Sequence, residues 1–131
     1  MEDASKEKYL VLDDYSELLK NSLMFLKNNF KGVIHTNRTI NTGWNQFKFD
    51  YSLTDENSMR FIIVRVIRKQ EDLLLLKLVL CEVDELVNSG IHDNQIIFML
   101  DVFINSSAKR FAADVKELTS SFRYIKNVKF I

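Results

Sequence analysis

Apolar residues recur at two spacings along this chain, and each spacing predicts a different kind of element. Between the Asp13-Asp14 pair, which supplies an N-cap, and about Phe30, they recur every three or four positions. This pattern predicts an amphipathic helix, and Gly32 follows it as a stop. Residues 1–8 are mostly charged or polar, and we expect them to form a flexible tail.

Three stretches in the middle of the chain predict a β-meander. Apolar and polar residues alternate in 45–53, which is typical of a strand with one buried face. Residues 60–68 and 73–83 are apolar on both faces, as internal strands are, and the polar segment 68–72 between them predicts a tight turn. Because the three stretches are consecutive and joined by short polar segments, antiparallel pairing is the simplest arrangement.

The second half of the chain predicts a helix, a strand, a helix and a final strand. Residues 84–90 begin with acids and end in glycine, which indicates a short helix. The apolar run 96–104 predicts a strand, although a run this short also fits a buried helix. A helix is expected from about 106 to 124, and the alternation of Val128 and Phe130 indicates an edge strand.

These elements predict one α+β domain over residues 1–131. Its mainly antiparallel sheet of four to six strands is expected to carry the N-terminal and C-terminal helices on one face. The segment 33–43 is left open between an edge strand and a loop.

The composition is that of a soluble globular domain, with 47% hydrophobic and 27% charged residues. Eighteen basic residues balance eighteen acidic ones, which argues against a general polyanion binder and favours association with a partner. The single cysteine, Cys81, excludes an internal disulfide. With no apolar leader and no apolar run near the ~20 residues that span a bilayer, we expect a cytoplasmic protein without membrane contact.

The sequence lacks the residue patterns that are typical of catalysis. His35 and His92 stand neither in a metal-ligand spacing nor beside a nucleophile, and Cys81 is expected to be a small core residue of a strand. The three glycines are too far apart to form a phosphate-binding loop. We therefore expect no catalytic residues, no bound metal and no cofactor, and a non-enzymatic role is favoured.

Charges of opposite sign gather in two segments, which are the candidate binding sites. From Glu82 to Asp101 every formal charge is negative, and an acidic rim for a basic partner is predicted, with helix capping and a solvated loop as the simpler explanation. From Lys109 onward cations dominate and aromatic residues interleave with them, which offers a nucleic-acid surface as the alternative. The rim consists of Glu82, Asp84, Glu85 and Asp93, and the alternative surface of Lys109, Arg110, Arg123, Tyr124, Lys126 and Lys129.

The expected order of elements over 45–104 resembles the core of the nuclease superfamily that is named for its Asp and Glu-x-Lys residues. Members need an Asp on the second strand of the meander and Glu-x-Lys on the third, which hold a divalent cation and assist the attacking water. Here the second predicted strand, 60–68, has no acid, and the third ends in Glu82-Val83-Asp84, with Asp in place of Lys. The resemblance is one of topology and implies a degenerate nuclease-like fold; a metal-dependent hydrolase using Glu82 and Asp84 is a further alternative.

The sequence thus favours a protein-binding module of the immunity, adaptor or chaperone type. The expected partner is another protein, either a second copy in a homodimer or a different chain, with nucleic acid as the less favoured partner. Arg65 and Lys77 lie on otherwise apolar predicted strands, which indicates that one face of the sheet is not wholly core.

Overall fold

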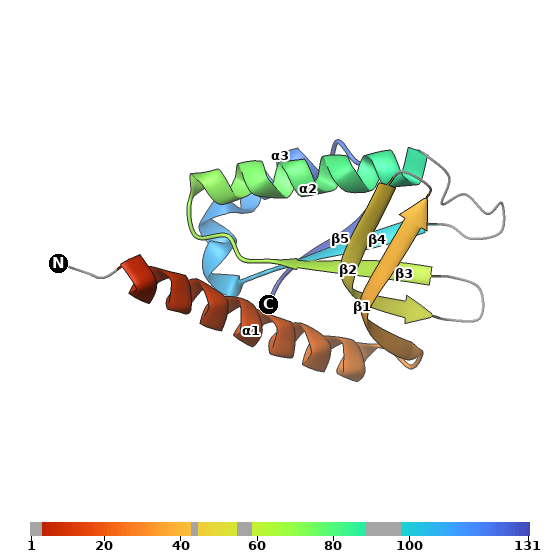
Figure 1. Cartoon of the computed structure of the whole chain (residues 1–131), viewed down its shortest axis with the longest axis horizontal. Helices are drawn as coiled ribbons and strands as arrows, with labels where there is room; N and C mark the ends of the chain where they lie inside the picture. The colour runs from red at the N-terminus through yellow and green to blue at the C-terminus, as the bar shows by residue number, and fades with distance from the viewer. Residues whose placement is uncertain (1–3, 43–44, 55–58, 89–97) are drawn as a thin grey trace.

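The structure is a computed structural model that describes residues 4–42, 45–54, 59–88 and 98–131 (Figure 1). Within these residues, a five-stranded sheet stands in the order β1-β2-β3-β4-β5. The first three strands pair antiparallel, whereas β4 is parallel to β3 and β5 is parallel to β4. The elements are α1 (Ala4–Asn29), β1 (Val33–Thr42), β2 (Asn45–Thr54), β3 (Met59–Arg65), α2 (Gln70–Asn88), β4 (Phe98–Ile104), the 3₁₀ helix η1 (Ser106–Phe111), α3 (Ala112–Thr119) and β5 (Ile125–Phe130).

The α+β class and the number of strands agree with the sequence-based expectation, but the sheet is mixed rather than mainly antiparallel. Within the apolar run 96–104, residues 98–104 form a strand, β4, while 96 and 97 lie outside the described residues. The closing strand is β5. The antiparallel meander consists of β1, β2 and β3, so it begins one strand earlier in the chain than expected. Its first strand, β1, lies in the segment 33–43, which the sequence left open between a strand and a loop.

The expected strand over 73–83 is wrong, since these residues form the middle of α2. Its buried positions recur at helical spacing, and leucine, glutamate and lysine favour a helix over a strand. The separate short helix expected at 84–90 is also wrong, because 84–88 continue α2. The buried residues of α2 are Leu73, Leu76, Leu80, Val83, Leu86 and Val87.

The first and last predicted helices have different limits from those expected. Helix α1 begins at Ala4, so that 4–8 are helical rather than a tail, and this segment has no glycine or proline to stop a helix. The C-terminal helix is divided into η1 and α3 and ends at Thr119, whose hydroxyl donates a hydrogen bond to the carbonyl of Val115 at 2.8 Å.

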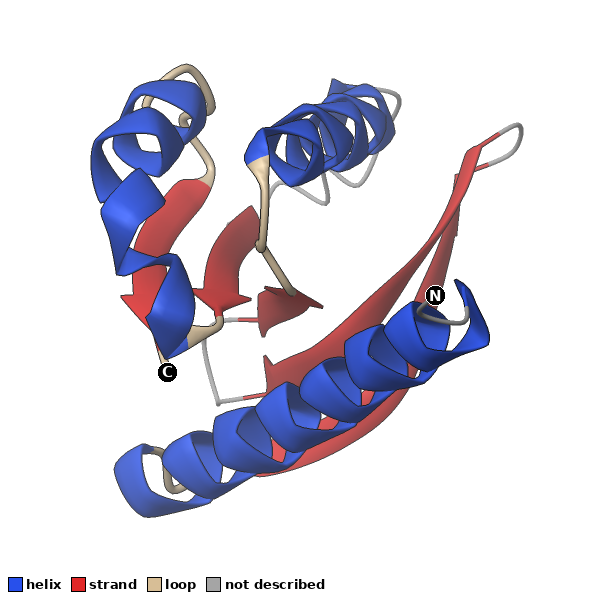
Figure 2. Cartoon of the chain, turned by 90° about the vertical axis from the view of Figure 1, so that its left-hand side faces the viewer, coloured by secondary structure: helices blue, strands red, loops and turns tan. Residues whose placement is uncertain are grey.

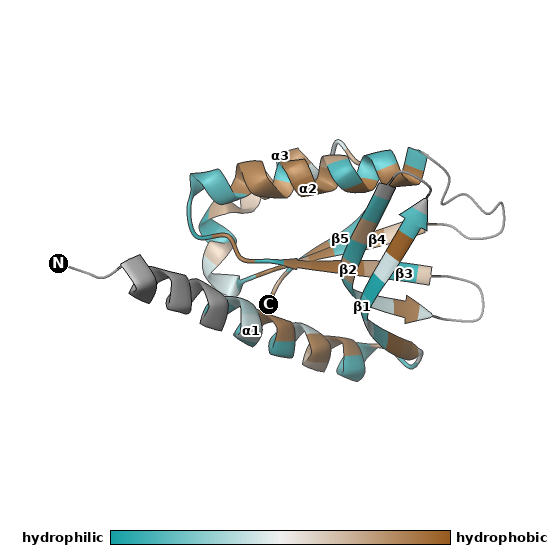
Figure 3. Ribbon diagram, viewed as in Figure 1, coloured by the Kyte–Doolittle hydropathy of each residue, from teal (hydrophilic) through white to brown (hydrophobic). Residues whose placement is uncertain are grey.

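The expectation that the N-terminal and C-terminal helices share one face of the sheet is wrong, because α1 packs on one face whereas η1 and α3 pack with α2 on the other (Figure 2). On β3, Ile62 and Val64 pack with α1, whereas Phe61 and Ile63 pack with α2 on the opposite face. This double burial explains why the middle of β3, residues 61–64, is apolar throughout (Figure 3).

A carboxylate, Asp50, fixes the point where β2 leaves β3. Pairing of these strands ends at Tyr51 and Ile62, and beyond it the Asp50 carboxylate accepts a hydrogen bond from the backbone N–H of Val64 at 2.8 Å. The same carboxylate accepts from Arg65 Nη1 at 3.1 Å and from the hydroxyl of Tyr15 on α1. The side chain thus replaces a strand as the hydrogen-bond acceptor.

The β1–β2 hairpin curves away from the sheet at this point (Figure 2). Phe47 and Phe49 pack with α2, whereas Tyr51 and Leu53 pack with α1. On β1, Asn37 lies between Thr36 and Arg38, which both pair with β2. Its φ of 54° is a left-handed conformation that asparagine tolerates.

We predict that Asp50→Ala lowers the free energy of unfolding by about 2–3 kcal/mol, because a backbone N–H and a hydroxyl both lose their acceptor. Tyr15→Phe removes one of these bonds and should cost about 1 kcal/mol. Urea unfolding measures both values. A cost for Asp50→Ala no larger than that for Tyr15→Phe would contradict this role of Asp50.

Two tyrosines, the buried Tyr124 and the half-buried Tyr15, are predicted to limit the stability of the fold at alkaline pH. Burial raises the pKa of Tyr124, and burial together with the hydrogen bond to Asp50 raises the pKa of Tyr15. The pKa of each tyrosine in the folded state lies above its ordinary value of about 10. The protonated hydroxyls therefore contribute their full stability below about pH 10, and this contribution is lost as the pH rises through the folded-state pKa. Unfolding free energies measured from neutral to alkaline pH should decrease less steeply for the Tyr15→Phe, Tyr124→Phe double variant. An unchanged slope would show that other groups set the limit.

Candidate functional site

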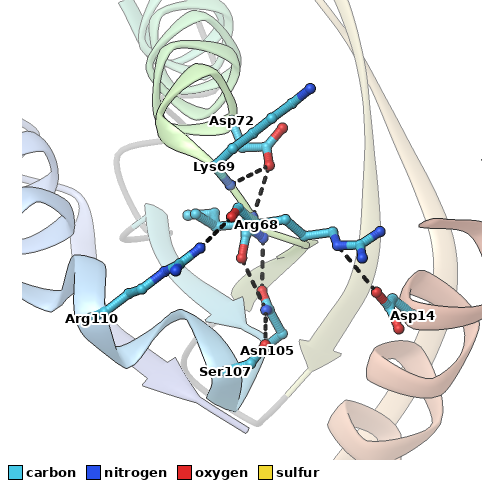
Figure 4. A network of polar contacts seen from close by, with 8 residues as sticks. Asp14, Arg68, Lys69, Asp72, Asn105, Ser107 and Arg110 are labelled. Carbon is cyan, nitrogen blue, oxygen red and sulfur yellow. Dashed lines mark hydrogen bonds and ion pairs between the residues drawn. The ribbon is translucent and has the colours of Figure 1, made fainter. Parts of the chain in front are cut away.

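The start of α2 is fixed by a network of polar contacts (Figure 4). The carboxylate of Asp72, in the first turn, accepts hydrogen bonds from the backbone N–H groups of Arg68 at 2.8 Å and Lys69 at 3.1 Å. These are donors that a helix N-terminus would otherwise leave without a partner. The guanidinium of Arg68 also lies 3.6 Å from the Asp14 carboxylate, an exposed ion pair that contributes little.

The segment that leads into α2 is held from the end of β4 and from η1 (Figure 4). Asn105 Oδ1 accepts from the backbone N–H of Ile67 at 2.7 Å, and Asn105 Nδ2 donates to the carbonyl of Ile67 at 3.0 Å. Arg110 donates to the carbonyl of Arg68 at 2.7 Å. Both backbone groups of Ile67 are therefore satisfied by one side chain.

Apolar packing and a hydrogen bond from Tyr124 hold the inner side of α2 on the sheet. Leu76 and Leu80 are buried against the sheet, and the hydroxyl of Tyr124 donates to the carbonyl of Leu80 at 2.8 Å. Because its start and its inner side are both fixed, α2 cannot rotate about its axis, and the residues on its outer side face away from the sheet.

Three leucines lie together on that outer side. Leu74, Leu75 and Leu78 are 59%, 58% and 53% exposed, and their spacing places them on one side of the helix. We call these three residues the leucine face. The other large hydrophobic residues that are strongly exposed in the described part of the chain, Met24 and Val33, belong to α1 and β1.

Cys81 lies one turn beyond Leu78 and is exposed. The expectation that it is a core residue is wrong, because it followed from placing 73–83 in a strand. On the helix, position 81 falls on the outer side, seven residues after Leu74.

Helix α2 places the described residues of the predicted acidic rim on different sides, so that they do not form one surface. Glu82 and Glu85 are exposed and follow Leu78 at four and seven residues, so that they extend the leucine face toward the end of α2. Asp84 is half-buried on another side of the helix and accepts a hydrogen bond from Asn88 Nδ2 at 3.4 Å. Asp93 lies outside the described residues.

A groove of about 470 Å³ runs between α2 and α3, next to the leucine face. Leu74 belongs to both, and Leu73 and Leu118 supply the other apolar side chains of the groove. The remaining lining residues are polar or charged: Gln70, Glu71, Lys77 and Asp114.

The residues of the predicted nucleic-acid surface come from several elements. Lys109 and Arg110 are exposed on η1, Arg123 is exposed before β5, and Lys126 and Lys129 are exposed on β5. Tyr124 is buried, with its ring 5.6 Å from that of Phe98, so it is not accessible for stacking on a base.

The element order helix, three antiparallel strands, helix and parallel strand lies at α1 to β4 rather than at 45–104. The second strand of the meander is therefore β2, which carries Asp50, while the third, β3, has no acid. Asp50 lines a pocket of about 580 Å³, but its carboxylate is bound by Arg65. The motif remains incomplete.

Three other acidic residues, Asp101, Glu82 and Asp84, are also unsuited to holding a metal. Asp101 on β4 is buried, with Oδ2 2.6 Å from Arg60 Nη2 and Oδ1 3.2 Å from Asn127 Nδ2. Glu82 and Asp84 are two residues apart on a helix and point to different sides. Among the described residues, no three His, Cys, Asp or Glu side chains are grouped as metal ligands would be.

Comparison of the chain with protein-family models, with curated proteins and with solved structures finds no match. In the part of the chain that the structure describes, no helix is both long and apolar enough to cross a membrane.

The leucine face was missed by sequence reasoning, although the sequence carries a signal for it. Leu73, Leu76, Leu80, Val83 and Val87 repeat at alternating spacings of three and four, which indicates the buried stripe of a helix. Once that stripe is recognised, Leu74, Leu75 and Leu78 fall outside it and are expected to be exposed.

We predict that the thiol of Cys81 reacts with a thiol reagent in the folded protein at a rate close to that in the unfolded chain, because it is exposed. Absorbance of the released reporter group measures the rate, with Cys81→Ser as the blank. A native rate lower by orders of magnitude would place Cys81 in the core and contradict the orientation of α2.

Proposed function

We propose that this chain is a non-enzymatic module that binds another protein through the leucine face of α2. The observation that supports this most is the exposure of three adjacent leucines on a helix whose opposite side is fully packed. Exposed leucines are ordinary when scattered, but a contiguous apolar patch is typical of an interaction site.

The leucine face supplies part of the free energy that specific binding requires, because a millimolar Kd already corresponds to about 4 kcal/mol and association also costs translational and rotational freedom. Fully burying a leucine is worth about 1.5–3 kcal/mol, so covering three half-exposed leucines contributes about 2–4 kcal/mol. Glu82 and Glu85 add charges beside the apolar contacts, and such charges affect the association rate and the choice of partner more than the affinity.

A cytoplasmic adaptor, immunity or chaperone-type role fits these features. An exposed cysteine without a second cysteine in the chain is best kept as a free thiol in a reducing compartment. The chemistry of the surface is that of recognition, since it combines apolar contact area with flanking charges.

We predict that Leu74→Gln with Leu78→Gln abolishes most partner capture, with each substitution weakening binding by about 3- to 10-fold. Glutamine preserves helix propensity, so the change affects the surface and not the helix. Quantitative capture from native lysate compares this variant with the original chain. Met24→Gln, at an equally exposed apolar position on α1, is the matched control and should bind as the original chain does. Capture that is equal for all three proteins would contradict the proposal.

Nucleic-acid binding is a second candidate function, supported by the exposed cations Lys109, Arg123, Lys126 and Lys129 and by the nuclease-like element order. Its affinity for an oligonucleotide should fall steeply with added salt, because counterions are released on binding.

For that candidate, Arg123→Ala with Lys126→Ala should weaken oligonucleotide binding. The substitutions should also reduce the slope of log K against log salt concentration by about two, one for each phosphate contact that is lost. Lys20→Ala with Lys27→Ala removes the same charge from exposed positions on α1 and serves as the control. Fluorescence anisotropy measures both. Absence of binding at low salt would eliminate this function.

A further inference from the structure

We infer that the segment that binds α2 is an amphipathic helix with a basic polar side, which lies along the leucine face with one flank in the groove between α2 and α3. This inference rests on the proposed function, since it assumes that α2 is the binding surface, and it adds the shape and charge of the partner.

The shape of the surface favours a helix as the partner. The exposed outer side of α2 runs from Glu71 to Glu85, a rise of roughly 21 Å along the helix axis. Leu74 joins the leucine face to the groove, so the apolar surface widens toward α3 on one side. A helix of about four turns would cover this length with apolar residues at helical spacing. An extended peptide would gain no backbone hydrogen bonds here, because those of α2 are already made within the helix.

The charge of the surface favours a basic partner. Helix α2 carries five carboxylates and one lysine, a net charge of −4. Glu71, Glu82 and Glu85 are exposed at the two ends of the outer side, and Asp114 adds a carboxylate at the groove. Lys or Arg on the flanks of a bound helix would meet these groups, whereas acidic residues would be repelled.

The same charges disfavour a second copy of this chain as the occupant. An antiparallel pair of α2 helices in which Leu75 faces Leu78 of the other copy places Glu71 opposite Glu82. A parallel pair places each carboxylate opposite its own counterpart. Both arrangements bring like charges together, and a basic partner does not.

A displayed library of helix-forming peptides tests the partner's chemistry without knowledge of the natural partner. Peptides of about four turns with randomised positions are selected on the folded chain and counter-selected on the Leu74→Gln, Leu78→Gln variant. We expect the enriched peptides to carry apolar residues at positions i, i+3 or i+4 and i+7, with an excess of Lys and Arg.

An enriched peptide then serves as the probe in fluorescence anisotropy. Glu71→Gln with Glu82→Gln should weaken its binding by roughly 2- to 10-fold at low salt and by less at high salt. Lys109→Gln with Lys116→Gln, which changes exposed charges outside α2, should not weaken it. Thermal unfolding of each variant confirms that it is folded.

Three results would overturn the inference: enrichment of acidic or extended peptides, no enrichment over the leucine variant, or a dimer in sedimentation equilibrium that the leucine substitutions dissociate. If capture from lysate depends on the leucines while the selected peptides are not basic helices, the proposed function stands and this inference fails. If neither capture nor selection depends on the leucines, both fail.

Discussion

Burial of β3 on both faces is the constraint on which the rest of this structure depends. Ile62 and Val64 require a cover on one side of the sheet and Phe61 and Ile63 require one on the other, so that helices must pack on both faces. The strand that follows, β4, is parallel to β3, and a parallel neighbour requires a crossover. Helix α2 is that crossover, and it covers the Phe61 face as it returns.

Polar contacts determine where this crossover begins and how the sheet bends. Asn105 satisfies both backbone groups of Ile67, and Asp72 satisfies the first free N–H groups before α2. Where β2 leaves β3, the carboxylate of Asp50 on β2 accepts hydrogen bonds from the backbone N–H of Val64 on β3 and from the hydroxyl of Tyr15 on α1. Asn105 and Asp72 fix the start of α2, and the buried side of the helix packs on the sheet, so that Leu74, Leu75 and Leu78 remain on the outside.

The helix that carries the candidate site was also the element that the sequence misrepresented. In 73–80, leucines of the buried stripe alternate irregularly with leucines of the exposed face, and together they form an apolar run that only Lys77 interrupts. A run that is apolar at almost every position shows no clear period, so it fits an internal strand as well as a helix. The exposed leucines therefore concealed the helical pattern of the buried ones.

Other features could be predicted because their signals do not depend on the secondary structure assigned around them. The alternation in 45–53 identified β2, and Glu82 and Glu85 were expected to be exposed whether their segment was a strand or a helix. The left-handed Asn37 and the carboxylate contacts of Asp50 could not be predicted, since they depend on which strands become neighbours.

A photo-crosslinker attached to the thiol of Cys81 tests the central claim, that the outer side of α2 is a protein-binding surface, most directly. In native lysate we expect a discrete covalent adduct of the chain with another protein, and we expect Leu74→Gln with Leu78→Gln to remove it. The same reagent at position 24, in a Met24→Cys, Cys81→Ser chain, should give no such adduct. Adducts of equal yield from the two positions, or an adduct at Cys81 that the leucine substitutions leave unchanged, would contradict the account.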